Sequence, residues 1–170
     1  MNTTRSALRL SLLAVMAAAA CRGPLPVTYF EETPPGSGTW TVIPVEPAWV
    51  KTPPRRQDHI AFVVDNQSDL RDIARTNLDD WAARQVAMRV EVALRTIVPS
   101  PAAAAAASSA SSSLRLVHCA CRDEVLTRDE RVVGSRLVTV WGLYEIPMEK
   151  ALAPVAEPHR SAARAALEKL

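Results

Sequence analysis

The sequence His118-Cys119-Ala120-Cys121 is the stretch of this chain whose residue types and spacing best suit chemistry. Thiolate and imidazole groups are ligands for Cu(I) or Zn(II). Residues 114–122 are predicted to form a β-strand, in which successive side chains point to opposite faces. Cys119 and Cys121 would then share one face and His118 would lie on the other, so all three contact one metal ion only if the strand bends.

Three interpretations of these residues are open from the sequence. The first is that Cys119 and Cys121 are free thiols buried on the core face of the strand. The second is a strained disulfide between them, since Cα atoms two residues apart on a strand lie at about 6.5–7 Å, the upper limit for a disulfide. The third is a Cu or Zn site with His118, which would make the chain a periplasmic metal-handling protein.

Other catalytic patterns are missing from the sequence. It has no G-x-S-x-G motif and no glycine-rich phosphate loop, and it has five glycines in all. Asp79 and Asp80 are adjacent, so on a helix they point in different directions and do not form a carboxylate pair. The sequence therefore predicts a non-enzymatic protein with no catalytic residues and no cofactor.

The N-terminal segment has the pattern of an export signal. Residues 1–9 contain Arg5 and Arg9 and no acid, and residues 10–20 are apolar and end in four alanines. This apolar run is shorter than the roughly 20 residues that a membrane span requires. A basic start, a short apolar region and small residues before a cleavage site predict a signal peptide over residues 1–20.

The residues Ala18-Ala19-Ala20-Cys21 resemble a bacterial lipobox, although the usual leucine is replaced by Ala18. The resemblance implies that the Cys21 thiol carries diacylglycerol, that the chain is cut before it, and that the new amino end is acylated. Several acyl chains anchor a protein stably to a membrane. Residue 22 is Arg rather than Asp, which by resemblance to lipoprotein sorting implies the outer membrane, with the domain facing the periplasm.

The charge balance bears on the partners that the exported chain can bind. Arg5 and Arg9 are its only charged residues before Cys21, so the rest of the chain has 18 basic and 18 acidic residues. A neutral chain argues against nucleic acid as a partner and against a polybasic membrane clamp. The expected partners are the membrane, through the acyl chains, and an envelope protein.

Residues 21–56 are predicted to be a lipidated cysteine followed by a proline-rich tether. Eight of the 13 prolines lie in this segment, and proline removes backbone donors and favours extended chain. Trp40 and Trp49 are unusual for a solvated tether. Either they dock on the domain's own surface, which is the default interpretation, or they contact a partner.

Residues 57–170 are predicted to be a single α+β domain, with one long helix packed on a small, mainly antiparallel sheet. A strand is expected at residues 59–64, and a helix at 69–98 with Ser68 as N-cap. An antiparallel hairpin follows, with strands at 114–122 and 131–146. Short helices are expected at 148–152 and 158–170.

Two further expectations concern this domain. Residues 99–113 are a low-complexity Ala/Ser sequence and are predicted to be a solvated loop. Trp81 lies on the apolar stripe of the long helix and Trp141 on a strand that is apolar on both faces. If the helix crosses the sheet, both tryptophans should be buried.

The order of these elements resembles the twenty-kilodalton surface lipoprotein family of Gram-negative bacteria. The residues that carry the resemblance are ARTNLDDWAARQVAMRVEVALRTIV (74–98) and RLVTVWGLYEIPMEKAL (136–152). The family includes lipoproteins associated with the flagellum and the cell envelope. The resemblance implies an α+β domain, an envelope location and a structural or assembly role, and it supplies no catalytic residues.

Overall fold

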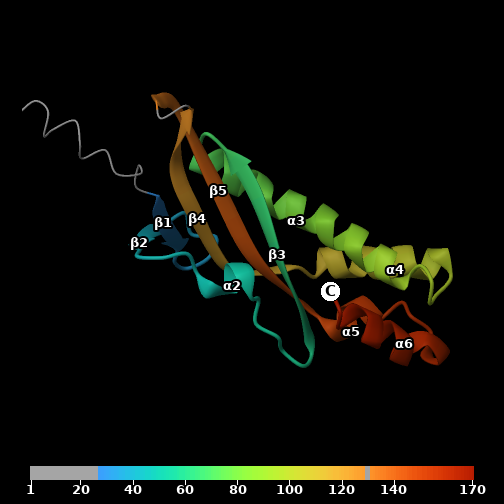
Figure 1. The fold of residues 1–170 in the computed structure, drawn as a ribbon. Coiled ribbons are helices and arrows are strands. Elements are labelled where there is room, and N and C mark those ends of the chain that lie inside the picture. Colours follow the sequence, from blue (N-terminus) through green and yellow to red (C-terminus); the bar gives the residue numbers. More distant parts are fainter. Residues whose placement is uncertain (1–26, 129–130) are drawn as a thin grey trace, which may run out of the picture.

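The computed structural model describes residues 27–128 and 131–170. It confirms the α+β class, with five antiparallel strands in the order β2-β1-β4-β5-β3 (Figure 1). The strands are β1 Thr28–Glu32, β2 Trp40–Ile43, β3 His59–Ser68, β4 Arg115–Arg128 and β5 Arg131–Pro147. The helices are α2 Ala48–Lys51, α3 Arg71–Leu94, α4 Ser100–Ser112, α5 Met148–Leu152 and α6 Glu157–Leu167.

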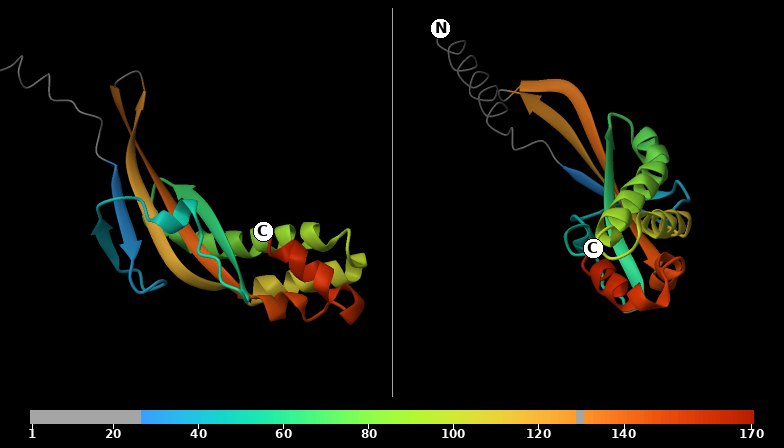
Figure 2. Two further views of the ribbon diagram at one scale, coloured as in Figure 1. Left: turned by 60° about the horizontal axis from the view of Figure 1, so that its bottom comes forward. Right: turned by 90° about the vertical axis from the view of Figure 1, so that its right-hand side faces the viewer.

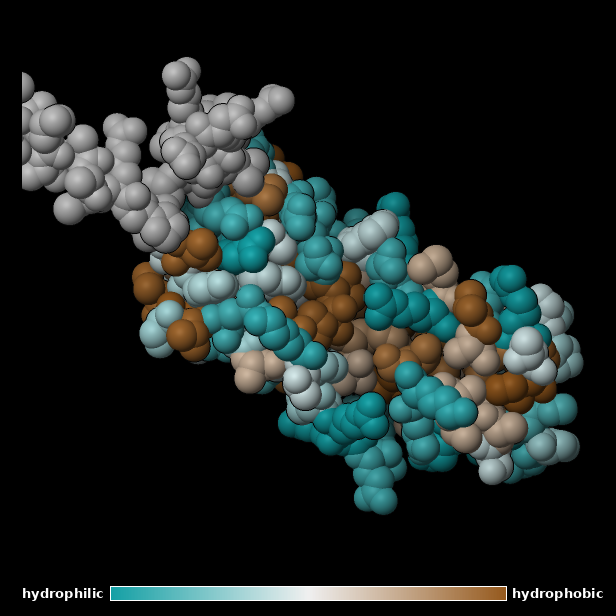
Figure 3. Space-filling view, viewed as in Figure 1, coloured by the Kyte–Doolittle hydropathy of each residue, from teal (hydrophilic) through white to brown (hydrophobic). Residues whose placement is uncertain are grey.

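The sheet has a front face, covered by α3, and a back face, against which α2 lies. Figure 2 shows α2 and α3 on opposite sides of the sheet. Along β3 the front-face side chains Ile60, Phe62 and Val64 are buried, whereas Ala61 and Val63 on the back face are half-buried. Figure 3, which views the back face, shows apolar surface over the middle of the sheet.

Helix α3 buries one residue in every four along its whole length. The fully buried side chains are Ala74, Leu78, Ala82, Val86, Val90 and Leu94. A step of four residues turns about 400° around a helix, so this row advances by about 40° per step. The helix therefore faces the sheet near its start and the other helices near its end.

Two predictions about α3 are wrong, and the rotation of the buried row explains the first of them. Trp81 lies beside the buried row rather than on it, and 43% of its surface is exposed. Trp141 on β5 is 9% exposed, but it lies on the back face of the sheet, so α3 does not cover it as predicted. Ser68 is not the N-cap, because β3 continues through it and the helix begins after Leu70. The Ser68 hydroxyl instead accepts a hydrogen bond from the Leu70 amide at 3.3 Å.

The predicted tether over residues 21–56 is wrong for the part of it that the structure describes. Strand β1 pairs with β4 and with β2, so this segment supplies two of the five strands. Prolines are compatible with this arrangement because they flank the strands and α2 rather than interrupt them. The domain therefore starts at about residue 28 and not at residue 57.

The predicted solvated loop over residues 99–113 is also wrong, because these residues form helix α4. Ala103, Ala106, Ala107 and Ala110 are buried on one side of the helix. Alanine has the highest helix propensity, and its small side chain allows close packing against α3. The spacing of three and four residues between the buried alanines is that of an amphipathic helix built entirely from small side chains.

Strand β5 is central and pairs with both β4 and β3. The pairing of β1 with β4 reaches Asp123, and that of β3 with β5 reaches Val138. Beyond these residues β4 and β5 continue as a two-stranded hairpin, which extends from one end of the molecule. Helices α4, α5 and α6 gather at the opposite end (Figures 1 and 2).

Candidate functional site

The structure separates the three residues of the HCAC pattern as strand alternation predicts. Cys119 pairs with Gly142 and Cys121 with Val140, and both side chains are fully buried on the front face beneath α3. His118 lies on the back face with 47% of its side chain exposed. The three side chains do not converge on one point, so the geometry does not form the predicted alternative metal site.

Cys119 and Cys121 are both free thiols, in agreement with the first interpretation and not with the disulfide. Burial raises the pKa of both thiols, that of Cys121 to about 11. A protonated thiol is a poor nucleophile and a poor metal ligand. These residues therefore act as small apolar side chains in the core. Within residues 27–128 and 131–170, no three His, Cys, Asp or Glu side chains are grouped to hold a metal ion.

His118 instead takes part in the packing of α2 on the back face. Its ring stacks on Trp49 of α2, with centroids 5.9 Å apart and an interplanar angle of 23°. Its Nδ1 lies 3.7 Å from Glu31 Oε1. Trp49, one of the two aromatic residues singled out in the expected tether, thus docks on the domain's own sheet, as the default interpretation held.

A buried ionic cluster on the front face was not predicted from the sequence; we call it the Glu32 cluster, formed by Glu32, Arg75, Asp79 and Tyr144. The Glu32 carboxylate accepts hydrogen bonds from the Gly36 amide (2.9 Å) and the Gly38 amide (2.7 Å). Arg75 donates to Glu32 at 3.1 Å and to Asp79 at 3.1 Å. The Tyr144 hydroxyl donates to Asp79 at 2.5 Å.

The Glu32 cluster joins three elements that are distant in sequence, namely the β1–β2 turn, α3 and β5. Burial alone would raise the pKa of Glu32, but the two backbone donors and the Arg75 guanidinium outweigh burial and hold that pKa below its usual value. The Glu32 carboxylate is therefore ionised, and both of its oxygens accept hydrogen bonds. Burial, together with the bond to Asp79, raises the pKa of the Tyr144 hydroxyl, which stays protonated as a donor.

A second charged group fixes the first turn of α3. The Arg71 guanidinium lies 3.9 Å above the centroid of the Phe30 ring and 5.3 Å from that of Trp40. It is also 3.8 Å from Asp123, whose carboxylate accepts hydrogen bonds from Arg136. The bonds from Arg136 hold the pKa of Asp123 below its usual range, against the effect of burial. Both charged groups thus hold the β1–β2 hairpin against α3.

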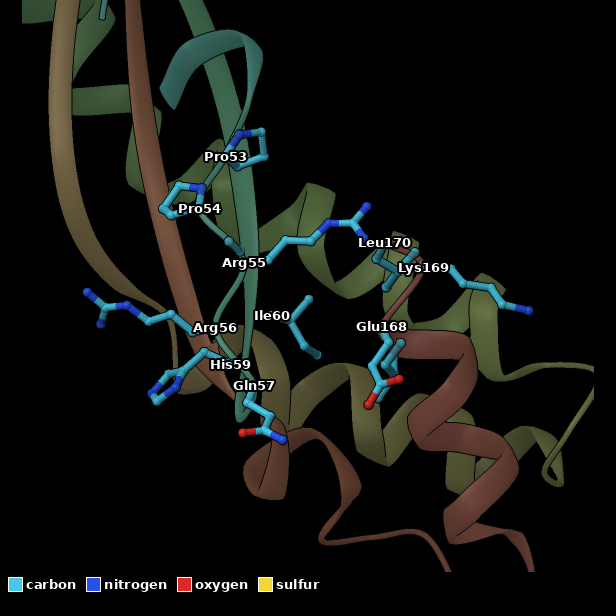
Figure 4. Close-up of a pocket in the computed structure, with 12 residues that line it drawn as sticks. Pro53, Pro54, Arg55, Arg56, Gln57, His59, Ile60, Glu168, Lys169 and Leu170 are labelled. Atoms are coloured by element: carbon cyan, nitrogen blue, oxygen red, sulfur yellow. The ribbon is translucent and has the colours of Figure 1, made fainter. Parts of the chain in front are cut away.

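A notch opens where β3 begins, with a cavity volume of about 510 Å³. One side is formed by residues 53–57 and the start of β3, and the other by residues 167–170. Figure 4 shows Arg55 extending across the notch toward Leu170, with Ile60 below Arg55. Arg56 points to the other side of β3, where it lies 3.3 Å from the buried carboxylate of Glu145.

The notch lies at the edge of the sheet, because β3 is paired only with β5. Edge strands present backbone donors and acceptors to an incoming segment. The titratable groups that line the notch are arginine, lysine, glutamate and one partly buried histidine.

Cys21, the expected lipidation site, lies outside the described residues and seven positions before Thr28, the first residue of β1. No helix in the described ranges is long and apolar enough to span a bilayer. A scan against protein-family models and searches of curated proteins and of solved structures find no match to this chain. The resemblance to the surface lipoprotein family therefore stays a prediction.

Proposed function

We propose that this protein is a membrane-anchored envelope lipoprotein with a non-enzymatic role in structure, assembly or protein binding. The observation that carries the proposal is the order of residues 1–21, in which a basic start and a short apolar run end at Ala18-Ala19-Ala20-Cys21. Acyl chains on Cys21 would insert in the outer membrane, and the domain would face the periplasm. The Glu32 carboxylate, buried and bonded to two backbone amides and Arg75, suits a rigid scaffold.

The short distance between the anchor and the fold sharpens this proposal. Seven residue steps separate Cys21 from Thr28, and an extended chain of that length spans at most about 25 Å. A domain attached in this way sits next to the bilayer rather than at the end of a long tether. Its hairpin end would lie near the membrane, and α4, α5 and α6 would point into the periplasm.

The surface that we assign to a protein partner is the notch beside β3. An extended segment of the partner would lie along the edge of β3, where main-chain hydrogen bonds provide affinity. An acidic side chain of that segment would meet Arg55, and an apolar one would meet Ile60. This role requires no chemistry from the buried thiols or from the Glu32 cluster.

Two variants test the anchor in cells. Cys21→Ser should abolish fatty-acid labelling and leave the precursor uncleaved by lipoprotein signal peptidase, whereas Arg22→Asp should keep the label and move the protein toward the inner membrane. Normal processing of Cys21→Ser to a soluble periplasmic product would refute lipid anchoring at this residue.

The partner surface is tested by photo-crosslinking in intact cells. A photoreactive amino acid at position 55 should give a discrete adduct with an envelope protein, and the same group at the exposed position 150 of α5 should not. Equal capture from both positions, or no capture from position 55, would count against the notch.

A further inference from the structure

We infer that the outer side of the β1–β2 hairpin is a membrane-contact surface, which rests on the lipid bilayer beside the acylated Cys21 and fixes the orientation of the domain. The inference rests on the proposed lipid anchor and adds a second contact between the domain and the membrane. It does not involve the notch beside β3 or the buried charges of the front face.

The first observation is a group of exposed apolar side chains, which we call the β1–β2 patch. It consists of Val27, Val42 and Val45, which are 43%, 69% and 65% exposed. Of the exposed large apolar side chains in the described ranges, these three are the nearest in sequence to Cys21. Figure 3 shows apolar atoms at the end of the molecule where β1 and β2 lie. Single exposed apolar residues are ordinary, but a group of them on one element is typical of a contact surface.

The pairing of β1 with β2 explains why these valines lie together and uncovered. Tyr29 pairs with Ile43, and Val27 and Val45 each lie two residues beyond this pair, at the open end of the hairpin. Val42 lies on β2, an edge strand that pairs only with β1. No further strand of the described chain lies beyond β2, so the patch faces away from the rest of the sheet.

The second observation is the scarcity of charge around the patch. Between Arg22 and Glu46 the chain has only two charged residues, Glu31 and Glu32. The Glu32 side chain is buried in the Glu32 cluster, and that of Glu31 lies 3.7 Å from His118 on the back face. Transfer of a charged group into an apolar environment is costly. An edge of the sheet that is almost free of charge is therefore suited to contact with lipid.

The position of the anchor identifies the bilayer as the occupant of the patch. Six residue steps join Cys21 to Val27, and an extended chain of that length spans at most about 22 Å. With acyl chains on Cys21, the bilayer stays within reach of the patch, so a weak attraction is sufficient for contact. A protein partner would have to displace a membrane surface that the anchor already holds at this place.

The contact determines which edge of the sheet lies on the membrane. One row of paired residues crosses the whole sheet and joins Gln67, Thr139, Arg122, Tyr29 and Ile43. Gln67 and Ile43 therefore lie at the same level of the sheet but on opposite edges. A domain held only by its anchor would bring both edges to the membrane equally often. A domain that rests on the patch keeps β2 at the membrane and leaves the notch beside β3 open to the periplasm.

The test uses the acylated full chain in phosphatidylcholine vesicles that contain lipids spin-labelled on the acyl chain. A fluorophore is attached to Val45→Cys or, as the matched control, to Gln67→Cys, which is exposed on the opposite edge. Cys119 and Cys121 are buried and stay unlabelled, and the Cys21 sulfur carries the lipid. The spin labels should quench the fluorophore at position 45 about threefold more than at position 67, because interfacial apolar residues lie about 5–10 Å into the boundary between headgroups and acyl chains.

A charge placed in the patch should weaken the contact. Val42→Glu should reduce the quenching at position 45 by about half or more, because a carboxylate resists entry into the bilayer. Val92→Glu, at a valine of α3 that is 59% exposed, should leave the quenching unchanged. Fatty-acid labelling and thermal unfolding of both variants should match those of the wild type.

The possible failures of the inference and of the lipid anchor are distinguishable. Equal quenching at positions 45 and 67 of an acylated protein would overturn the inference and leave the anchor intact. Photo-capture of an envelope protein from position 45 in intact cells would also overturn the inference, because protein would then occupy the patch. A purified chain without acyl groups would overturn both proposals.

Discussion

At the scale of single residues, Glu32 is the most consequential side chain in this fold. Its side chain is 1% exposed and it accepts hydrogen bonds from two backbone amides and Arg75. Glu32→Gln should lower the free energy of unfolding by about 2–4 kcal/mol, because the buried Arg75 guanidinium then loses one of the two carboxylates that balance its charge. Urea denaturation measures this, with Glu31→Gln as the control expected to change stability by less than about 1 kcal/mol.

The same residue predicts a dependence of stability on pH. The folded state holds the pKa of Glu32 below its usual value of 4.5, so the unfolded chain binds a proton more readily than the folded chain does. The stabilisation is complete above the unfolded-state pKa and is lost as the pH falls through the lower folded-state value. Glu32→Gln should flatten this acid limb. An unchanged acid limb in the variant would show that other carboxylates control it.

The two tryptophans of the core region provide a matched pair of substitutions. Trp141→Ala should cost about 3–5 kcal/mol, since it removes a buried side chain and leaves a cavity. Trp81→Ala should cost clearly less, at most about half as much, because 43% of its surface is exposed in the folded protein. Thermal unfolding of both variants decides this, and equal losses would contradict the orientation of α3 described above.

At the scale of elements, the sequence predicted the long helix, the hairpin of β4 and β5 and the strand β3 because their apolar residues are large and periodic. Helix α4 was missed because its buried side is made only of alanine, which a hydrophobic pattern does not distinguish from low complexity. Strand β1 was missed because it is short and lies between prolines. Residues 39–45, which contain β2, show the alternation of a short edge strand, but they were assigned to the tether. Their place in the sheet depends on pairing with β4, about 90 residues later in the chain.

The Glu32 cluster was missed for a related reason. The pair Arg75 and Asp79 has the i, i+4 spacing of an ordinary surface ion pair on a helix. Only the pairing of β1 brings Glu32 beneath this pair and makes it a buried network. The faces of the strand on which His118, Cys119 and Cys121 lie, in contrast, were predicted correctly. Side chains alternate between the two faces of a strand, so their placement needs no long-range contact.

Helix α4 permits a direct test at the element scale. Ala106→Leu should lower the free energy of unfolding by about 1–3 kcal/mol, because the extra carbon atoms have no room against α3. Ala105→Leu, on the exposed side of the same helix, should change it by less than about 0.5 kcal/mol. If both variants unfold like the wild type in urea, α4 does not pack as described.

At the scale of the whole molecule, the short link from Cys21 to β1 predicts a fixed orientation on the membrane. The end of β3 lies at the hairpin end of the molecule and α5 at the opposite end (Figure 1). A fluorophore on Gln67→Cys should therefore transfer energy to a headgroup acceptor more efficiently than one on Lys150→Cys. Cys119 and Cys121 are buried and should stay unlabelled. Equal transfer from the two positions would mean that the domain is not held in this orientation.

Mass spectrometry of the N-terminal peptide from membrane-derived protein tests the proposal that the protein is a lipoprotein anchored at Cys21. We expect a chain that begins at Cys21, with a diacylglyceryl group on its sulfur and an acyl group on its amino end. A mature chain that begins at any other residue, or a Cys21 that carries a free thiol, would contradict it.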